Sequence, residues 1–134
     1  MRAQMISPPG LHRGVPYEYA AVAPEARLVF SAGACPLDGE GRVVAPGDVE
    51  AQAWQTLANL LAALAAAGAG PGDIVKTTVY VVAREHAELL RVWRIVEEGL
   101  APARPPSTLL GVAMLGYSEQ LVELEAVAVA PAAE

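Results

Sequence analysis

The sequence is poor in metal-binding and basic side chains. Its one cysteine, Cys35, excludes an internal disulfide, and its two histidines, His12 and His86, form no cluster at zinc-ligand spacing. We therefore expect no metal site. Only 9 Lys and Arg residues stand against 15 Asp and Glu, which gives a formal net charge of −6. A nucleic-acid backbone would be repelled by this charge, so we expect no nucleic-acid partner.

The sequence also lacks an apolar run long enough to cross a membrane. The most apolar stretch, 57–67, is interrupted by Asn59 and ends at Gly68, whereas a spanning helix needs about 20 apolar residues. The N-terminal residues 1–5 carry one positive charge but lead into Ser-Pro-Pro-Gly at 7–10 rather than into an apolar core. This start is not typical of a signal peptide, so we expect a cytoplasmic protein with no membrane partner.

Apolar residues are nevertheless abundant, at 54% of the 134 residues. The length fits one domain, which we expect to cover residues 1–134. A small domain with this much apolar surface often buries part of it against other subunits. We therefore expect an oligomer.

Periodicity predicts two helices and five strands. The first helix is expected from an N-cap at Asp48 to a C′ glycine at Gly68, because apolar residues recur there at helical spacing. Turn residues at 24–25 and 116–118 indicate hairpins at both ends of the chain. A further small hairpin is expected around the Asp-Gly-Glu-Gly turn at 38–41. The expected strands are 19–23, 27–34, 74–82 (a central strand), 107–115 and 121–130, and the second helix is 84–99.

This order of elements predicts the α+β class, with a mixed β-sheet and two helices packed on one face. The other face of the sheet is left uncovered and needs a partner. On the last strand Glu123 and Glu125 share one face, while Val122 and Leu124 share the other.

Three motifs in a fixed order carry a resemblance to a known family. The first is Ser-x-Gly-x-x-Pro within 31–38, the second runs without a gap from 48 to 81, and the third is Val-Glu-Leu-Glu-Ala-Val-Ala at 122–128. With these motifs the chain resembles the RidA (YjgF) family over nearly its whole length. The resemblance implies a chorismate-mutase-like fold and a homotrimer, in which the helix-free sheet faces form a central barrel with three pockets between subunits.

The resemblance further implies a hydrolase, a deaminase of the 2-iminobutanoate/2-iminopropanoate type. Such enzymes convert reactive 2-enamine or 2-imine acids to 2-keto acids and ammonia, and no cofactor is required. The chemistry needs a cation for the substrate carboxylate, ideally a bidentate arginine, and a carboxyl group to position and activate water. The alternative is a non-catalytic small-acid-binding or regulatory protein on the same scaffold, because similarity of fold does not separate the two.

Three residues match functional positions of the family. Glu123 matches the water-positioning acid, and Gly33 matches the glycine whose backbone N–H meets the ligand carboxylate. The family tyrosine falls on Tyr19 when counted back from Gly33, with Tyr17 as the alternative if a gap is allowed. These matches suggest that Glu123 and Tyr19 are catalytic and that Gly33 binds substrate.

The cation position departs from the family pattern. Ser107 stands where the family carries its carboxylate-binding arginine, and Arg104, within a Pro-Ala-Arg motif, lies three residues earlier, roughly 10 Å along an extended chain. Arg91 stands where typical members carry a helix asparagine near the pocket. We hypothesise that Arg91 or Arg104 supplies the positive charge of the pocket and that Ser107 offers a hydroxyl. The alternative is that Arg91 lies on a solvated helix edge and that the pocket has lost archetypal deaminase chemistry.

Cys35 lies two residues after Gly33, a position that invites a nucleophile. Neither histidine can be placed beside it from sequence to act as a base. We therefore interpret Cys35 as a small thiol of the buried core.

Overall fold

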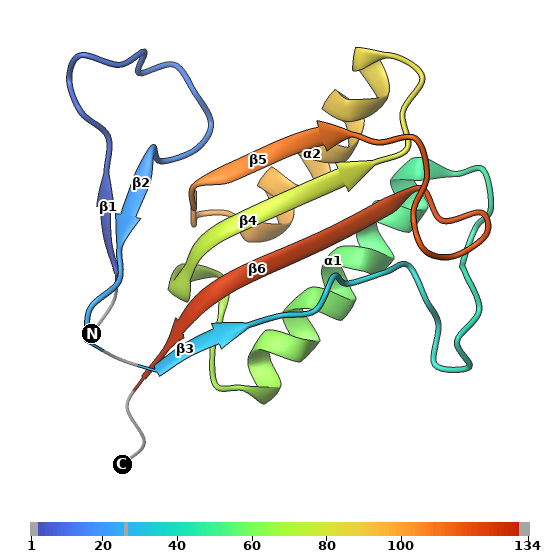
Figure 1. Ribbon diagram of the computed structural model, residues 1–134, viewed down its shortest axis with the longest axis horizontal. Helices are drawn as coiled ribbons and strands as arrows, with labels where there is room; N and C mark the ends of the chain where they lie inside the picture. The colour runs from blue at the N-terminus through green and yellow to red at the C-terminus, as the bar shows by residue number, and fades with distance from the viewer. Residues whose placement is uncertain (1–2, 26, 132–134) are drawn as a thin grey trace.

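The computed structural model describes residues 3–25 and 27–131, and its main body has two layers, a four-stranded sheet and a pair of helices (Figure 1). The predicted α+β class and mixed sheet are confirmed. In spatial order the strands are β3 (Arg27–Phe30), β6 (Val122–Ala130), β4 (Ile74–Val81) and β5 (Ser107–Gly111). The helices are α1 (Val49–Ala66) and α2 (His86–Leu100), and a short 3-10 helix, η1 (Pro71–Asp73), precedes β4.

The pairing of the strands differs at the C-terminal end from the expected hairpin. β5 pairs with β4 in parallel, and β6 pairs antiparallel with both β4 and β3. The helix α2 returns the chain to the beginning of β4, so β5 runs parallel to β4. β4 therefore separates β5 from β6, and the predicted hairpin between these two strands is wrong. The prediction of 74–82 as a central strand is confirmed.

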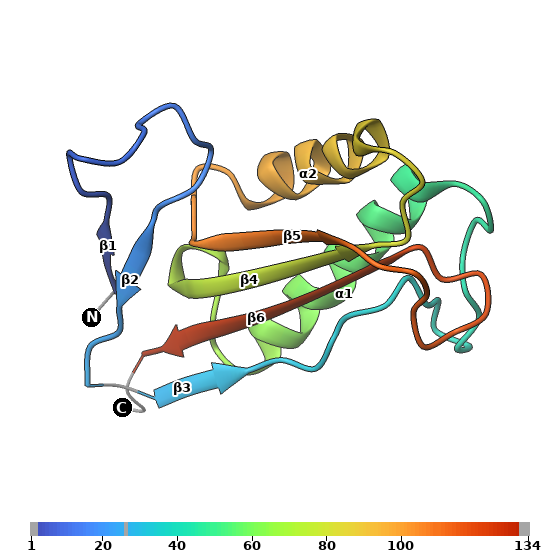
Figure 2. The ribbon, with the colours of Figure 1, turned by 45° about the horizontal axis from the view of Figure 1, so that its top comes forward.

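The N-terminal part forms a separate two-stranded sheet of β1 (Gln4–Ile6) and β2 (Ala20–Val22). Figures 1 and 2 show this hairpin set apart from the main sheet. The expected pairing of the strands at 19–23 and 27–34 is therefore wrong, because β2 pairs with β1 while β3 pairs with β6. β1 was not predicted because it is only three residues long, too short to show alternation.

Both helices follow the predicted signals closely. The Asp48 side chain accepts a hydrogen bond from the Ala51 N–H at 3.0 Å and caps α1. Gly68, at φ +84°, follows the last turn in the left-handed conformation that glycine adopts at low cost. The second helix begins at His86, two residues later than expected, and ends at Leu100.

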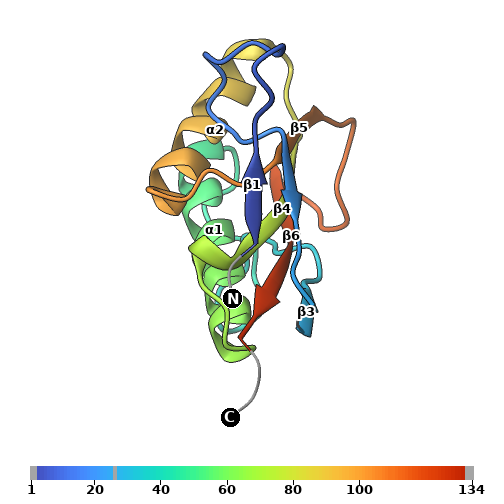
Figure 3. The ribbon, with the colours of Figure 1, turned by 90° about the vertical axis from the view of Figure 1, so that its left-hand side faces the viewer.

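The two helices cover the same face of the main sheet (Figure 3). Inward side chains of β4 and β6 pack there against apolar side chains of both helices, and burial of this apolar surface is the main stabilising contribution. The core includes Leu57, Leu60 and Leu64 of α1, Val92 and Val96 of α2, Val79 and Val81 of β4, and Val122 and Leu124 of β6. The opposite face bears no helix, as predicted, and Phe30 on β3 is 72% exposed. Within the described residues, no helix combines the length and the apolar character needed to cross a membrane.

Candidate functional site

Glu123 lies on the uncovered face at the beginning of β6, next to the segment that follows β3. Strand alternation places Val122 and Leu124 in the core and leaves Glu123 half-buried on the other side. Ala34 and Leu124 exchange backbone hydrogen bonds of 2.8 and 3.1 Å, which holds Gly33 against the Glu123 side chain. A side-chain carbon at position 33 would overlap the Glu123 carboxylate. The structure therefore brings Gly33 and Glu123 together, and only glycine leaves room for this carboxylate.

Two further side chains reach the Glu123 carboxylate. The Cys35 Sγ lies 3.4 Å from Oε1, and the Gln120 Nε2 donates to the same oxygen at 3.2 Å. Burial, followed by the hydrogen bond and the charge of Glu123, raises the pKa of the Cys35 thiol from 9.0 to about 11. Cys35 is therefore a protonated donor at neutral pH, which disfavours a nucleophilic role.

The interpretation of Cys35 as a small thiol of the buried core is wrong, because the side chain is half-buried and directed to a carboxylate. Sequence reasoning also missed Gln120. The one local signal for it is its position three residues before Glu123, which indicates nothing without the turn between them. Cys35 lies 88 residues from Glu123 in the chain, so no local pattern indicates that contact.

Tyr19 and Arg104 meet in a different place, a cavity of about 130 Å³ beneath the N-terminal loop. The Tyr19 hydroxyl donates to the His12 carbonyl at 2.7 Å, and the Arg104 guanidinium donates to the Val15 carbonyl. Tyr17 lines the same cavity and packs edge-on against Tyr19, with ring centroids 5.6 Å apart. Both tyrosines considered from sequence are thus present here, beside Arg104.

Ser107, at the beginning of β5, points toward the helix layer. Its Oγ lies 2.5 Å from the Thr77 Oγ1 and donates to the Pro105 carbonyl at 3.0 Å. It lines a cavity of about 280 Å³ with Tyr17 and Trp93. Both of its hydrogen-bonding partners belong to the protein, so the hydroxyl is engaged within the fold.

Arg91 is exposed on α2 and lines a cavity of about 330 Å³ with Arg84 and Glu88. In the part of the chain that the structure describes, the ion pairs are those of Arg42 with Asp38 and Glu40. Neither guanidinium of this cavity is therefore paired with a carboxylate among those residues. The proposed cation Arg91 thus lies apart from the cavity of Tyr19 and Arg104.

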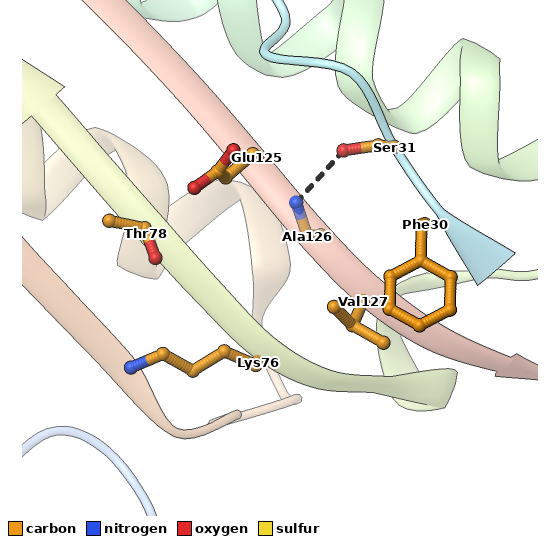
Figure 4. A pocket seen from close by; sticks show the side chains of 7 residues that line it. All are labelled: Phe30, Ser31, Lys76, Thr78, Glu125, Ala126 and Val127. Carbon is orange, nitrogen blue, oxygen red and sulfur yellow. Dashed lines mark hydrogen bonds between the residues drawn. The ribbon is translucent and has the colours of Figure 1, made fainter. Parts of the chain in front are cut away.

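A fourth cavity, of about 270 Å³, opens on the uncovered sheet face near Glu125 (Figure 4). Glu125 lies on the same face as Glu123 and accepts a hydrogen bond of 2.6 Å from the Tyr80 hydroxyl. This bond, followed by burial, raises the pKa of Tyr80. Lys76, which lines the cavity, donates to the Thr108 Oγ1 at 2.6 Å. Glu125 is thus engaged with Tyr80, whereas Glu123 is held by Cys35 and Gln120.

No group of three or more His, Cys, Asp or Glu side chains is placed to hold a metal ion in the ranges 3–25 and 27–131. In a single chain, four of the predicted site residues lie in two pairs, Gly33 with Glu123 and Tyr19 with Arg104. Ser107 and Arg91 each line a cavity of their own.

Comparison with known proteins supports one family throughout. A family model described as Endoribonuclease L-PSP matches residues 13–130. A RutC family protein from Synechocystis sp. is 37% identical over 119 residues, with 87% of each chain covered. The putative reactive intermediate deaminase TdcF from Escherichia coli is 34% identical over 106 residues, with 76% of this chain and 78% of TdcF covered.

Solved structures agree with the sequence relatives. The crystal structure of YyfB from Yersinia pestis, a protein of unknown function in the conserved Rid protein family, superposes with a TM-score of 0.89. Its sequence is 32% identical, and the superposition covers 96% of this chain and 99% of YyfB. Together with the family model and the sequence relatives, this likeness shows that the chain belongs to the RidA (YjgF) family.

Proposed function

We propose that this protein is a hydrolase that deaminates reactive 2-enamine or 2-imine acids, or a closely related small metabolite. The observation that carries the proposal is the Glu123 carboxylate held beside Gly33, on a strand whose other residues are all apolar except Glu125. Some relatives are named as deaminases of this kind, among them TdcF and the 2-iminobutanoate/2-iminopropanoate deaminase of Salmonella typhimurium. A carboxylate that can accept a proton from water, as Glu123 can, suits the same class of substrate.

The reaction needs one water and no redox change. Glu123 accepts a proton from water as the water oxygen attacks C2 of the imine, and it passes this proton to the imine nitrogen, which gives a tetrahedral amino alcohol. Glu123 then takes the proton of the C2 hydroxyl and delivers it to the amino group as the C–N bond breaks, so that ammonia leaves and the hydroxyl oxygen becomes the keto oxygen. Among the hydrogen bonds of the described residues none uses the Gly33 N–H, so this donor is available for the substrate carboxylate.

We further propose that three copies assemble through the uncovered sheet face and that each active site forms between two of them. Two observations support this assembly. The face carries exposed apolar side chains, including Leu28 and Phe30 of β3 and Leu110 of β5. In addition, the pair of Tyr19 and Arg104 lies apart from the pair of Gly33 and Glu123 in one chain, so a neighbouring copy is needed to join them. Tyr19 would then orient the substrate opposite Glu123.

The carboxylate of the substrate requires a cation, which we assign to Arg104 or Arg91. Arg104 has the advantage of lying beside Tyr19. Arg91 has the advantage that its guanidinium has neither an ion pair nor a side-chain hydrogen bond within the described residues, whereas the Arg104 guanidinium donates to the Val15 carbonyl. Ser107 would contribute to substrate binding by lining the cavity beside Tyr17, not by offering a free hydroxyl. Replacing Arg91 and Arg104 singly by Ala distinguishes the two, because the variant lacking the true ligand should show KM raised about 10-fold or more.

The decisive assay generates 2-aminoacrylate with a dehydratase and follows keto-acid release with and without the protein. We expect the protein to accelerate release and Glu123→Gln to abolish the acceleration. Glu125→Gln is the matched control, because Glu125 occupies the same strand face but bonds to Tyr80. Equal rates with and without the wild-type protein would contradict the proposed activity.

The second candidate is a non-catalytic small-acid-binding protein on the same scaffold, and two observations count against the turnover that would distinguish the hydrolase from it. The Arg104 guanidinium is bonded to the Val15 carbonyl, and the Ser107 hydroxyl is engaged with Thr77 and Pro105. Calorimetric titration with a stable 2-keto acid tests it. Tight binding without any turnover of the imine would support this function in place of hydrolysis.

A further inference from the structure

The Glu123 carboxylate is held asymmetrically. Its Oε1 is the target of both the Cys35 thiol, at 3.4 Å, and the Gln120 amide, at 3.2 Å. No donor among the described residues is bonded to its Oε2, which is the atom nearest to the position a side-chain carbon of Gly33 would occupy. One oxygen is thus anchored to the protein, and the other faces the Gly33 backbone.

Gln120 is well suited to act as an anchor because it is itself fixed. It is 3% exposed, and its Oε1 accepts from the Tyr117 N–H at 3.1 Å. Its Nε2 donates to the Val122 carbonyl at 3.0 Å as well as to Glu123. A buried amide with both ends engaged does not rotate away without leaving a polar group unsatisfied.

A second buried glutamine braces the turn that carries Gln120. Gln52 of α1, 0% exposed, accepts from the Leu121 N–H at 2.8 Å and donates to the Glu119 carbonyl at 3.0 Å. Glu119 adopts a positive φ of +69° in this turn, a conformation that costs energy for a residue other than glycine. The core of α1 is thereby linked through the turn to the carboxylate.

Cys35 supplies the other anchor. Its thiol lies 3.4 Å from the Glu123 Oε1 and 3.5 Å from the Gly33 carbonyl. The single S–H can serve either acceptor, and the negative charge of the carboxylate favours Glu123. The high pKa of this thiol is consistent with a donor that keeps its proton at neutral pH.

We infer that Gln120 and Cys35 are positioning residues that anchor Oε1 of Glu123, so that Oε2 is the one oxygen left to take the proton of the attacking water. The inference rests on the proposed hydrolysis and extends it to residues that do not touch the substrate. Without the anchors the carboxylate rotates about its terminal bond, and the reactive geometry is populated less often. Because an amide is a stronger donor than a thiol, Gln120 contributes more than Cys35.

Kinetics of matched variants test the positioning role. We expect Cys35→Ala to lower kcat about 5-fold with KM unchanged, and Gln120→Met to lower it about 10-fold or more. Cys35→Ser restores a donor and should return kcat to within about 2-fold of wild type. A merely structural role would lower thermal stability, and Cys35→Ser would not restore kcat.

A titration that needs no turnover tests the same contact independently. Cys35 is the chain's one cysteine, so the ultraviolet absorbance of the thiolate reports its ionisation alone once the tyrosine signal is subtracted with Cys35→Ala. We expect Glu123→Gln to lower the pKa of Cys35 from about 11, and the control Glu125→Gln to leave it unchanged.

The outcomes separate this inference from the proposed function. An unchanged Cys35 titration in Glu123→Gln, or a wild-type kcat in both Cys35→Ala and Gln120→Met, would overturn the positioning role. A shifted titration together with no turnover by the wild-type protein would keep the anchored geometry and overturn the hydrolase assignment instead.

Discussion

Replacing Gly33 by alanine should lower the activity of the protein far more than its stability. The added carbon would overlap the Oε2, Cδ and Cγ atoms of Glu123. These atoms form the end of a flexible side chain, and Gly33 itself does not lie in the left-handed region of φ. The carboxylate is therefore expected to rotate toward solvent while the backbone stays in place.

The cost of this rotation is small for folding and large for catalysis. Glu123 loses its bonds to Cys35 and Gln120, but a half-buried carboxylate regains bonds to water, so the free energy of unfolding should fall by only about 1 kcal/mol. Displacement of the group that activates water should lower kcat by about 100-fold or more.

Urea unfolding and the coupled keto-acid assay measure the two effects. Gly39→Ala is the matched control, because a side-chain carbon at Gly39 meets nothing within 4 Å. A Gly33→Ala variant with kcat within about 3-fold of wild type would refute the role given to this contact. Loss of about 4 kcal/mol or more in stability would show that the Glu123 side chain is locked rather than displaceable.

Three further predictions concern packing, pH dependence and assembly. In Gly99→Ala the new carbon would overlap Leu57 between the helices, so urea unfolding should show the free energy of unfolding lowered by about 1–3 kcal/mol. At an open helix site the same substitution would raise it by about 1 kcal/mol. The pKa of Cys35 is about 11 in the folded protein against an ordinary 9.0. Between these pH values the thiol is ionised mainly in the unfolded chain, so the stability of the protein should fall as pH rises. In thermal melts over this range, the melting temperature of Cys35→Ala should fall less steeply than that of the wild type. Phe30→Glu places a charge on the uncovered face, where Phe30 is 72% exposed, and light scattering should show the mass fall from that of a trimer to that of a monomer.

The types of the main elements could be predicted from sequence because their signals are local. The N-cap of α1 and the glycine at its C-terminal end, for example, act within a few residues of the helix. Strand pairing could not be predicted in the same way. Whether β5 lies beside β4 or β6 depends on how α2 crosses the sheet, which no short pattern records.

The candidate site, too, could be predicted from sequence only in part. Resemblance to the family indicated Gly33 and Glu123, and strand alternation placed Glu123 on the uncovered face, where it lies beside Gly33. The contact of Cys35 with Glu123 depends on the bridge between Ala34 and Leu124, and that of Gln120 depends on the turn that Gln52 braces; both are tertiary features. Sequence spacing also could not indicate that Arg104 would be bonded to the Val15 carbonyl.

The most direct test of the central claim is the rate of keto-acid formation from 2-aminoacrylate, compared for the wild-type protein, Glu123→Gln and Glu125→Gln. Hydrolysis at the Glu123 carboxylate predicts acceleration by the wild-type protein and by Glu125→Gln, and no acceleration by Glu123→Gln. Acceleration by Glu123→Gln equal to that of the wild type would contradict it.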